Sequence, residues 1–142
     1  MQTAVRTRVE ALLESWDTIS LTLDTWTDRR TRSYLGITAH GMDSNMRLAF
    51  CCLGVVPMNE KHSGENLAAA VQKVLADYKM QDRVLSYVTD HAANVLKIQD
   101  FWKGPQLIGC AAHKLNLIAR HASNRVLCYS PRRTAPTGRP TD

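Results

Sequence analysis

The sequence predicts an α/β fold, a mixed sheet flanked by helices, and two observations point to it. Three apolar segments with strand-like alternation, separated by turn residues, follow one another over residues 19–56, as in an antiparallel meander. A helical pattern over residues 63–78 then leads to a short apolar strand at 84–89. A crossover helix makes that fourth strand parallel to the first, so we expect a mixed sheet with helices on both faces.

The N-terminal part is expected to hold one helix and three strands. The apolar spacing predicts an amphipathic helix at about residues 3–16, with a buried face formed by Val5, Val9, Leu12, Leu13 and Trp16. Strands are expected at 19–26, 34–43 and 46–56, which are rich in β-branched and apolar residues. The third strand is expected to end before Pro57, because proline cannot donate a hydrogen bond to a sheet.

The crossover helix has both a cap and an apolar face. Ser63 can accept a hydrogen bond from the first helical turn, and the buried face is predicted to comprise Leu67, Val71, Val74, Leu75 and Tyr78. After the fourth strand, a single helix is predicted over residues 92–102, because Gly104 and Pro105 would end it.

The C-terminal part is predicted to add a fifth strand at 107–111 and a short helix at 113–121 that turns Leu117 and Ile118 inward. The apolar pattern stops after this helix, and the following segment is basic and contains proline, so we expect it to be disordered. We therefore divide the chain into an N-terminal amphipathic helix, a core and a basic tail, at residues 1–18, 19–121 and 122–142.

Composition indicates a folded protein with an uneven charge. The chain has 142 residues, of which 44% are hydrophobic and 22% charged, which suits one globular core. Residues 1–120 carry 14 Lys and Arg against 12 Asp and Glu (+2), and residues 121–142 carry four Arg against one Asp (+3). A basic excess is compatible with nucleic acid, and a solvated charged surface has the same composition.

The sequence also gives indications of the cellular compartment and of whether the chain crosses a membrane. No apolar run is long enough to span a membrane, and the first residues lack the apolar segment of a secretion signal. The four cysteines show no disulfide framework, which favours a reducing compartment. We therefore expect no membrane partner, and a location in the cytosol or nucleus.

Two aspartates, Asp24 and Asp90, each follow an apolar strand segment. A carboxylate at the C-terminal edge of a buried strand faces a crevice, where it can hold a metal ion. Two such carboxylates on neighbouring strands make half of a two-metal phosphoryl-transfer site. The alternative from the residues alone is a pair of surface carboxylates that only cap or solvate a turn.

Four short motifs occur in order along residues 19–120. They are Leu-Asp-Thr-Trp-Thr at 23–27 with Ser-Tyr-Leu-Gly-Ile-Thr-Ala-His at 33–40, His-Ser-Gly-Glu-Asn at 62–66, Val-Thr-Asp-His-Ala-Ala-Asn at 88–94, and Cys-Ala-Ala-His-Lys-Leu-Asn-Leu at 110–117. Together they resemble the ribonuclease-H-like domain of hAT transposases and of their domesticated relatives, the zinc finger BED domain-containing proteins.

The resemblance implies a ribonuclease-H-like fold, DNA as a partner and a nuclear location. By position, Asp24 and Asp90 correspond to the first two catalytic acids of that family. This correspondence implies Mg²⁺ or Mn²⁺ as the cofactor and DNA strand cleavage and transfer as the ancestral activity. The donor chemistry agrees, because hard divalent cations prefer carboxylate oxygens.

The family's third acid, a glutamate beyond a large helical insertion, has no counterpart in this sequence. No glutamate follows Glu65, and the only acids after Asp90 are Asp100 and Asp142. The insertion, the C-terminal dimerisation segment and the N-terminal BED zinc finger also have no counterpart. We therefore expect a truncated, partial ribonuclease-H-like core that is inactive by itself, and leave its status as an enzyme open.

Two other functions stay open. One is a non-enzymatic interaction module that acts through its exposed sheet or dimerises with a full-length relative. The other is a fragment with no independent role, whose exposed edge and apolar face would promote aggregation.

Further residues are candidates for the site. Glu65 occupies a place comparable to a metal-binding glutamate of ribonuclease H, or it only stabilises the start of a helix. Three arginines flank the Asp24 strand end and can meet DNA phosphates, or they form a solvated turn: Arg29, Arg30 and Arg32. Trp26 and Trp102 are interpreted as core residues rather than as nucleic-acid stackers.

Cys110 and His113 form the family's Cys-x-x-His hallmark. A structural zinc site needs four ligands, and only His121 and Cys128 could complete one. Their spacing matches no ordinary zinc finger. We therefore expect no zinc, and a local structural role for the pair.

Overall fold

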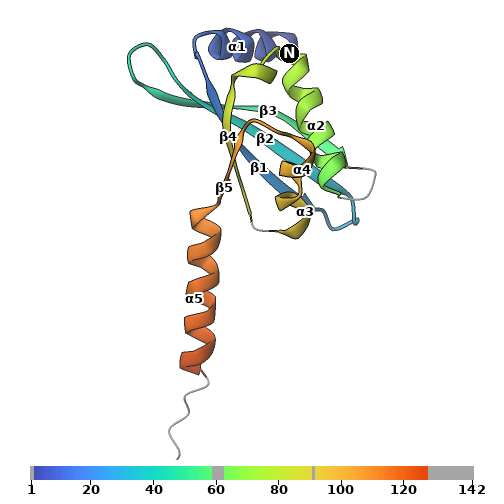
Figure 1. Cartoon of the computed structure of the whole chain (residues 1–142), viewed down its shortest axis with the longest axis vertical. Coiled ribbons are helices and arrows are strands. Elements are labelled where there is room, and N and C mark those ends of the chain that lie inside the picture. The colour runs from blue at the N-terminus through green and yellow to red at the C-terminus, as the bar shows by residue number, and fades with distance from the viewer. Residues whose placement is uncertain (1, 59–62, 91, 128–142) are drawn as a thin grey trace, which may run out of the picture. The chain divides into compact units, whose positions relative to one another are not determined.

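Five strands form one sheet in the computed structural model, which describes residues 2–58, 63–90 and 92–127 (Figure 1). In chain order the strands are β1 (Ile19–Thr27), β2 (Ser33–Met42), β3 (Leu48–Met58), β4 (Val84–Thr89) and β5 (Gln106–Gly109). Their order in the sheet is β3-β2-β1-β4-β5. The first three pair antiparallel, whereas β4 is parallel to both β1 and β5. The mixed, ribonuclease-H-like topology that the sequence predicts is confirmed.

The helices of the described chain are α1 (Gln2–Glu14), α2 (Gly64–Asp77), α3 (Ala93–Leu96), α4 (Ile98–Phe101) and α5 (Ala111–Leu127), with a 3₁₀ turn at Gln81–Arg83. The chain divides into two compact units, Met1–Cys110 and Ala111–Asp142, so α5 stands in a unit separate from the sheet. α2 is the crossover helix between β3 and β4. Its predicted cap is confirmed: the Ser63 hydroxyl oxygen accepts a hydrogen bond from the Asn66 N–H at 3.2 Å.

One face of the sheet is buried under helices. Along β1 the residues Ile19, Leu21 and Leu23 are buried, and those between them are half-buried or exposed. They belong to one hydrophobic cluster with residues of β2, β4 and the helices α1 to α4, among them Leu35, Ile37, Tyr87, Leu13, Leu67, Val71, Val95 and Ile98. The described helices of the first unit therefore pack against a single face, whereas the sequence predicted helices on both.

The opposite face, called here the open face, carries the residues that alternate with the buried set. The register between β1 and β2 places Asp24 and Trp26 there, opposite Gly36 and Tyr34. Exposed apolar side chains on the neighbouring strands share this face, including Met42, Leu48, Phe50, Val55 and Ile108. Exposed apolar side chains gathered on one face are typical of an interaction surface.

Two predicted element boundaries were wrong. β3 continues through Pro57 to Met58, because β3 is an edge strand, where a residue without an N–H is tolerated. The single helix predicted over 92–102 is instead two one-turn helices, separated at Lys97. Lys97 lies against Gly64, since a Cβ added to that glycine would come within 2.6 Å of the Lys97 Cβ. Tertiary packing against α2 thus overrides the helical periodicity.

The second unit also differs from the prediction. α5 extends over Ala111–Leu127 rather than 113–121, because no glycine or proline interrupts it before Leu127. Leu117 and Ile118, predicted to face inward, are exposed. Of the predicted tail, residues 122–127 belong to α5, and residues 128–142 lie outside the described residues. No helix in the described ranges is long and apolar enough to cross a membrane.

Tyr87 provides a test of the packing beneath β4. Its side chain is fully buried and stacks on Trp102, with 5.3 Å between ring centroids. Within the described residues its hydroxyl has no hydrogen-bond partner. Burying a hydroxyl without a partner costs about 1–3 kcal/mol. Tyr87→Phe is therefore expected to raise the free energy of unfolding by about 1 kcal/mol in urea unfolding at neutral pH.

The same variant has a pH signature. Burial raises the pKa of Tyr87, so the folded chain favours the protonated hydroxyl. The stability that this raised pKa contributes is fully present below the usual tyrosine pKa of about 10. It is lost as the pH rises through the pKa of Tyr87 in the folded chain. The wild type should therefore lose more stability than Tyr87→Phe between pH 8 and pH 11. Parallel losses in the two proteins would contradict this description of the Tyr87 environment.

Candidate metal and nucleic-acid site

Asp24 and Asp90 both lie just beyond the end of the pairing between β1 and β4. β1 and β4 are parallel neighbours, and the last residue pair between them joins Thr22 to Val88. Each aspartate follows its member of that pair by two residues: Asp24 lies within β1, opposite Gly36 of β2, and Asp90 directly follows the end of β4. Asp24 is exposed on the open face, whereas Asp90 is half-buried and its Oδ1 accepts a hydrogen bond from the Ala92 N–H at 3.3 Å.

Carboxylates are the donors that hard divalent cations prefer. Mg²⁺ is commonly bound by one or two carboxylates, with waters and substrate phosphates completing the shell. Among residues 2–58, 63–90 and 92–127, no three His, Cys, Asp or Glu side chains gather where they could hold a metal ion. In the part of the chain that the structure describes, Asp24 and Asp90 are thus two carboxylates without a third ligand gathered beside them, fewer than a two-metal clamp takes.

Glu65 is placed by the start of α2. It lies in the first turn of the helix, next to the capping residue Ser63, and its side chain is exposed. The close approach of Gly64 to Lys97 fixes this end of α2 against the junction of α3 and α4. An acidic residue here interacts favourably with the helix dipole whether or not a cation is bound.

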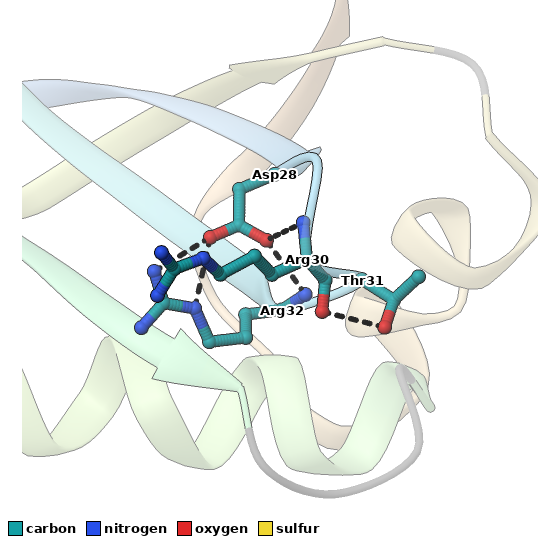
Figure 2. Close-up of polar contacts among 4 residues, drawn as sticks. All are labelled: Asp28, Arg30, Thr31 and Arg32. Atoms are coloured by element: carbon teal, nitrogen blue, oxygen red, sulfur yellow. Dashed lines mark hydrogen bonds and ion pairs between the residues drawn. The ribbon is translucent and has the colours of Figure 1, made fainter.

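The turn between β1 and β2 is organised by Asp28. Figure 2 shows its carboxylate directed into its own turn, where Oδ1 accepts hydrogen bonds from the backbone N–H groups of Arg30 and Arg32, both at 2.9 Å. Oδ2 accepts from the Arg32 guanidinium, with Nε at 2.9 Å. The hydrogen bond from the Arg32 backbone, then that from its side chain, lowers the pKa of Asp28. A charged Asp28 thus holds the turn closed.

The three arginines of this turn differ in the contacts that their side chains make. The Arg32 side chain pairs with Asp28, and its guanidinium carbon lies 5.9 Å from the centre of the Tyr34 ring. Arg29 and Arg30 are exposed, with Arg30 held to Asp28 through its backbone. Residues 28–32 thus carry three arginines and one aspartate, a local excess of two positive charges.

Trp26 is not a core residue, contrary to the prediction, whereas Trp102 is buried as predicted. The Trp26 side chain is 41% exposed and stacks on Tyr34, its cross-strand partner, with 5.7 Å between ring centroids and 23° between ring planes. The register explains the difference: Trp26 is an even number of residues from Asp24, so both lie on the open face.

The Cys-x-x-His pair lies where the two units meet in the sequence. Cys110 follows β5, and its backbone N–H donates to the Thr89 carbonyl oxygen at 2.9 Å. His113 is half-buried within α5, in the second unit. Cys128, one of the two residues that could complete a zinc site, falls outside the described residues, so the expectation of no zinc stays a prediction.

The chain is similar to known proteins over most of the sheet. Residues 22–105 match the model of the ZBED1 RNase-like domain. A putative transcriptional regulator, tpeD, of Talaromyces stipitatus is 30% identical over 97 residues, covering 66% of this chain and 12% of that protein. A putative AC transposase of Zea mays is 24% identical over 115 residues, covering 71% of this chain and 14% of the relative.

A third relative extends the match furthest along this chain among those described. The zinc finger BED domain-containing protein RICESLEEPER 2 of Oryza sativa subsp. japonica is 24% identical over 129 residues, covering 78% of this chain and 18% of the relative. The chain thus spans less than one fifth of the length of each of these three proteins.

Proposed function

The chain belongs to the ZBED1 RNase-like domain family, distantly related to hAT transposases, and from that premise we propose that it is a DNA-binding, metal-assisted but non-catalytic core. The single observation that carries the proposal is the placement of Asp24 and Asp90, each two residues beyond the pair Thr22–Val88 on adjacent parallel strands. We propose the nucleus as its location, since DNA is its ligand.

Asp24 and Asp90 are proposed to hold one Mg²⁺ or Mn²⁺ between them, with Glu65 as a further candidate ligand. A cation held there would supply positive charge to neutralise and polarise a DNA phosphate. The residues of the chain do the positioning: Ala92 donates a hydrogen bond that orients the Asp90 carboxylate. Arg29 and Arg30, exposed at the neighbouring turn, attract the phosphates on either side.

The small number of carboxylates is our reason for proposing a non-catalytic role. A two-metal mechanism stabilises both the attacking and the leaving oxygen, which takes more carboxylates than a pair. Within this sequence no glutamate follows Glu65, and the next acid after Asp90 is Asp100, which lies exposed in α4. We therefore propose that these 142 residues bind DNA without cleaving it.

Calorimetric titration with Mg²⁺ and with Mn²⁺ tests the proposal. The double variant Asp24→Asn/Asp90→Asn is expected to weaken cation binding at least tenfold, because two charged oxygen ligands become neutral amides. Asp82→Asn/Asp100→Asn, which neutralises two exposed aspartates elsewhere, is the matched control and should bind as the wild type does. Equal binding by the wild type and the Asp24/Asp90 variant would remove the metal site.

The open face supports a second candidate function, a dimerisation or protein-interaction module. Leu48 and Phe50 are more than 70% exposed, at 79% and 72%, and lie on the edge strand β3. Exposed apolar side chains beside an unpaired strand edge favour association with another chain. Sedimentation velocity over a range of protein concentrations distinguishes the two candidates, because only this one requires self-association or a protein partner.

A further inference from the structure

An aromatic pair lies beside Asp24 on the open face, and we propose that it is a stacking platform for an unpaired DNA base. The platform consists of Trp26, Tyr34 and Gly36. This inference rests on the proposed function only in taking DNA as the ligand, and it names the form of DNA: a strand whose bases are not paired.

Gly36 gives the platform its shape. A Cβ added to Gly36 would lie 3.0 Å from Cζ3 and 3.5 Å from Cη2 of Trp26, so the six-membered ring of the indole lies directly against this glycine. Gly36 pairs with Asp24 across the two strands. The indole therefore leans back over the pair that contains the candidate metal ligand.

Exposure shows that the indole has surface available to a ligand. Trp26 is 41% exposed although it contacts Gly36 and stacks on Tyr34. A large aromatic side chain with an accessible ring face is the group on which single-stranded nucleic acid stacks its bases. Trp26 also lies two residues from Asp24 on the same face, about 7 Å along the strand, so one DNA strand can reach both.

The charge around the platform favours a nucleic acid over an apolar protein segment. The turn that joins Trp26 to Tyr34 carries three arginines against Asp28 alone. The Arg32 guanidinium carbon lies 5.9 Å from the centroid of the Tyr34 ring, while Arg29 and Arg30 are exposed. An aromatic surface bordered by cations is the combination that binds single strands, through stacking and phosphate contacts together.

Fluorescence titrations of the full chain in EDTA test the platform. Three ligands of equal length are compared: a single-stranded oligonucleotide, the same strand with abasic central nucleotides, and the matched duplex. The single strand should quench the exposed Trp26, and it should bind more tightly than the abasic strand. Trp26→Ala should weaken binding of the single strand roughly tenfold to a hundredfold, the range expected for one lost base–aromatic stack.

Controls separate stacking from folding and from the metal site. Phe50→Ala removes another exposed aromatic ring of the same face, at the opposite end of β2 beside His40, and should leave DNA binding unchanged. Trp26→Leu keeps apolar bulk without an aromatic face and should bind like Trp26→Ala, with circular dichroism showing that both are folded. Because EDTA removes cations, loss of the Asp24/Asp90 metal site does not alter this result.

Three results of the DNA titrations would overturn the proposal. They are equal affinity for the base-containing and abasic strands, unchanged affinity after Trp26→Leu, and the lack of single-strand binding by the wild type. A change in Trp26 fluorescence with protein concentration but not with DNA would also overturn it, and would assign this surface to a second copy of the chain.

Discussion

Replacing Gly41 with alanine is expected to destabilise the first unit by about 3 kcal/mol. Gly41 lies on β2 opposite Ile19, and a Cβ added there would overlap the indole of Trp16, lying 2.6 Å from its Cγ and nearer still to Cδ2 and Cε3. Trp16 is fully buried, so its ring has no free space into which it can move. Overpacking of a rigid core site is destabilising even for one methyl group.

Urea unfolding of Gly41→Ala and Gly54→Ala measures this effect against a matched control. Gly54 lies on β3, and a Cβ added there meets nothing within 4 Å. Gly54→Ala should therefore be neutral or slightly stabilising, since alanine reduces the freedom of the unfolded chain. Equal stabilities for the two variants would show that Trp16 does not pack on Gly41.

Shortening Leu21 to alanine is expected to lower the free energy of unfolding by about 3 kcal/mol. Leu21 is fully buried in the first half of β1, the middle strand of the sheet. The change removes apolar contacts and leaves a cavity that its β2 and β4 neighbours, Ala39 and Tyr87, fill only in part. The effect matters for function because β1 is the strand that positions Asp24.

Leu85→Ala provides the comparison for Leu21→Ala in thermal and urea unfolding. Leu85 is on the adjacent strand β4, but its side chain is 60% exposed, so its truncation should change stability by less than about 0.5 kcal/mol. A similar loss in both variants would mean that burial on the helix-covered face does not govern the stability of the sheet.

Much of the fold is encoded in local patterns. The fourth strand has the predicted bounds, Val84–Thr89, because its apolar run is short and follows a strongly amphipathic helix. Ser63 caps α2 because its hydroxyl competes well for a free N–H at a helix start. The passage of β3 through Pro57 could not be predicted, because it depends on β3 being an edge strand. The break at Lys97 likewise depends on a contact with Gly64, distant in sequence.

The candidate site was predictable in part. Asp24 and Asp90 stand out in the sequence because each follows an apolar segment, and their matching positions beyond the Thr22–Val88 pair follow from the parallel pairing of β1 and β4. The exposure of Trp26 was missed, although the alternation of Ile19, Leu21 and Leu23 carries the signal that would have found it. Its stacking on Tyr34 requires the β1–β2 register, which pairs these two residues across the strands.

Titration with Mn²⁺, followed in amide NMR spectra, tests most directly the claim that Asp24 and Asp90 hold one cation just beyond the β1–β4 pairing. A bound paramagnetic ion broadens the signals of nearby amides first. The account predicts early broadening at both Asp24 and Asp90, and its disappearance in Asp24→Asn/Asp90→Asn. Broadening centred on other residues, or unchanged broadening in the double variant, would contradict it.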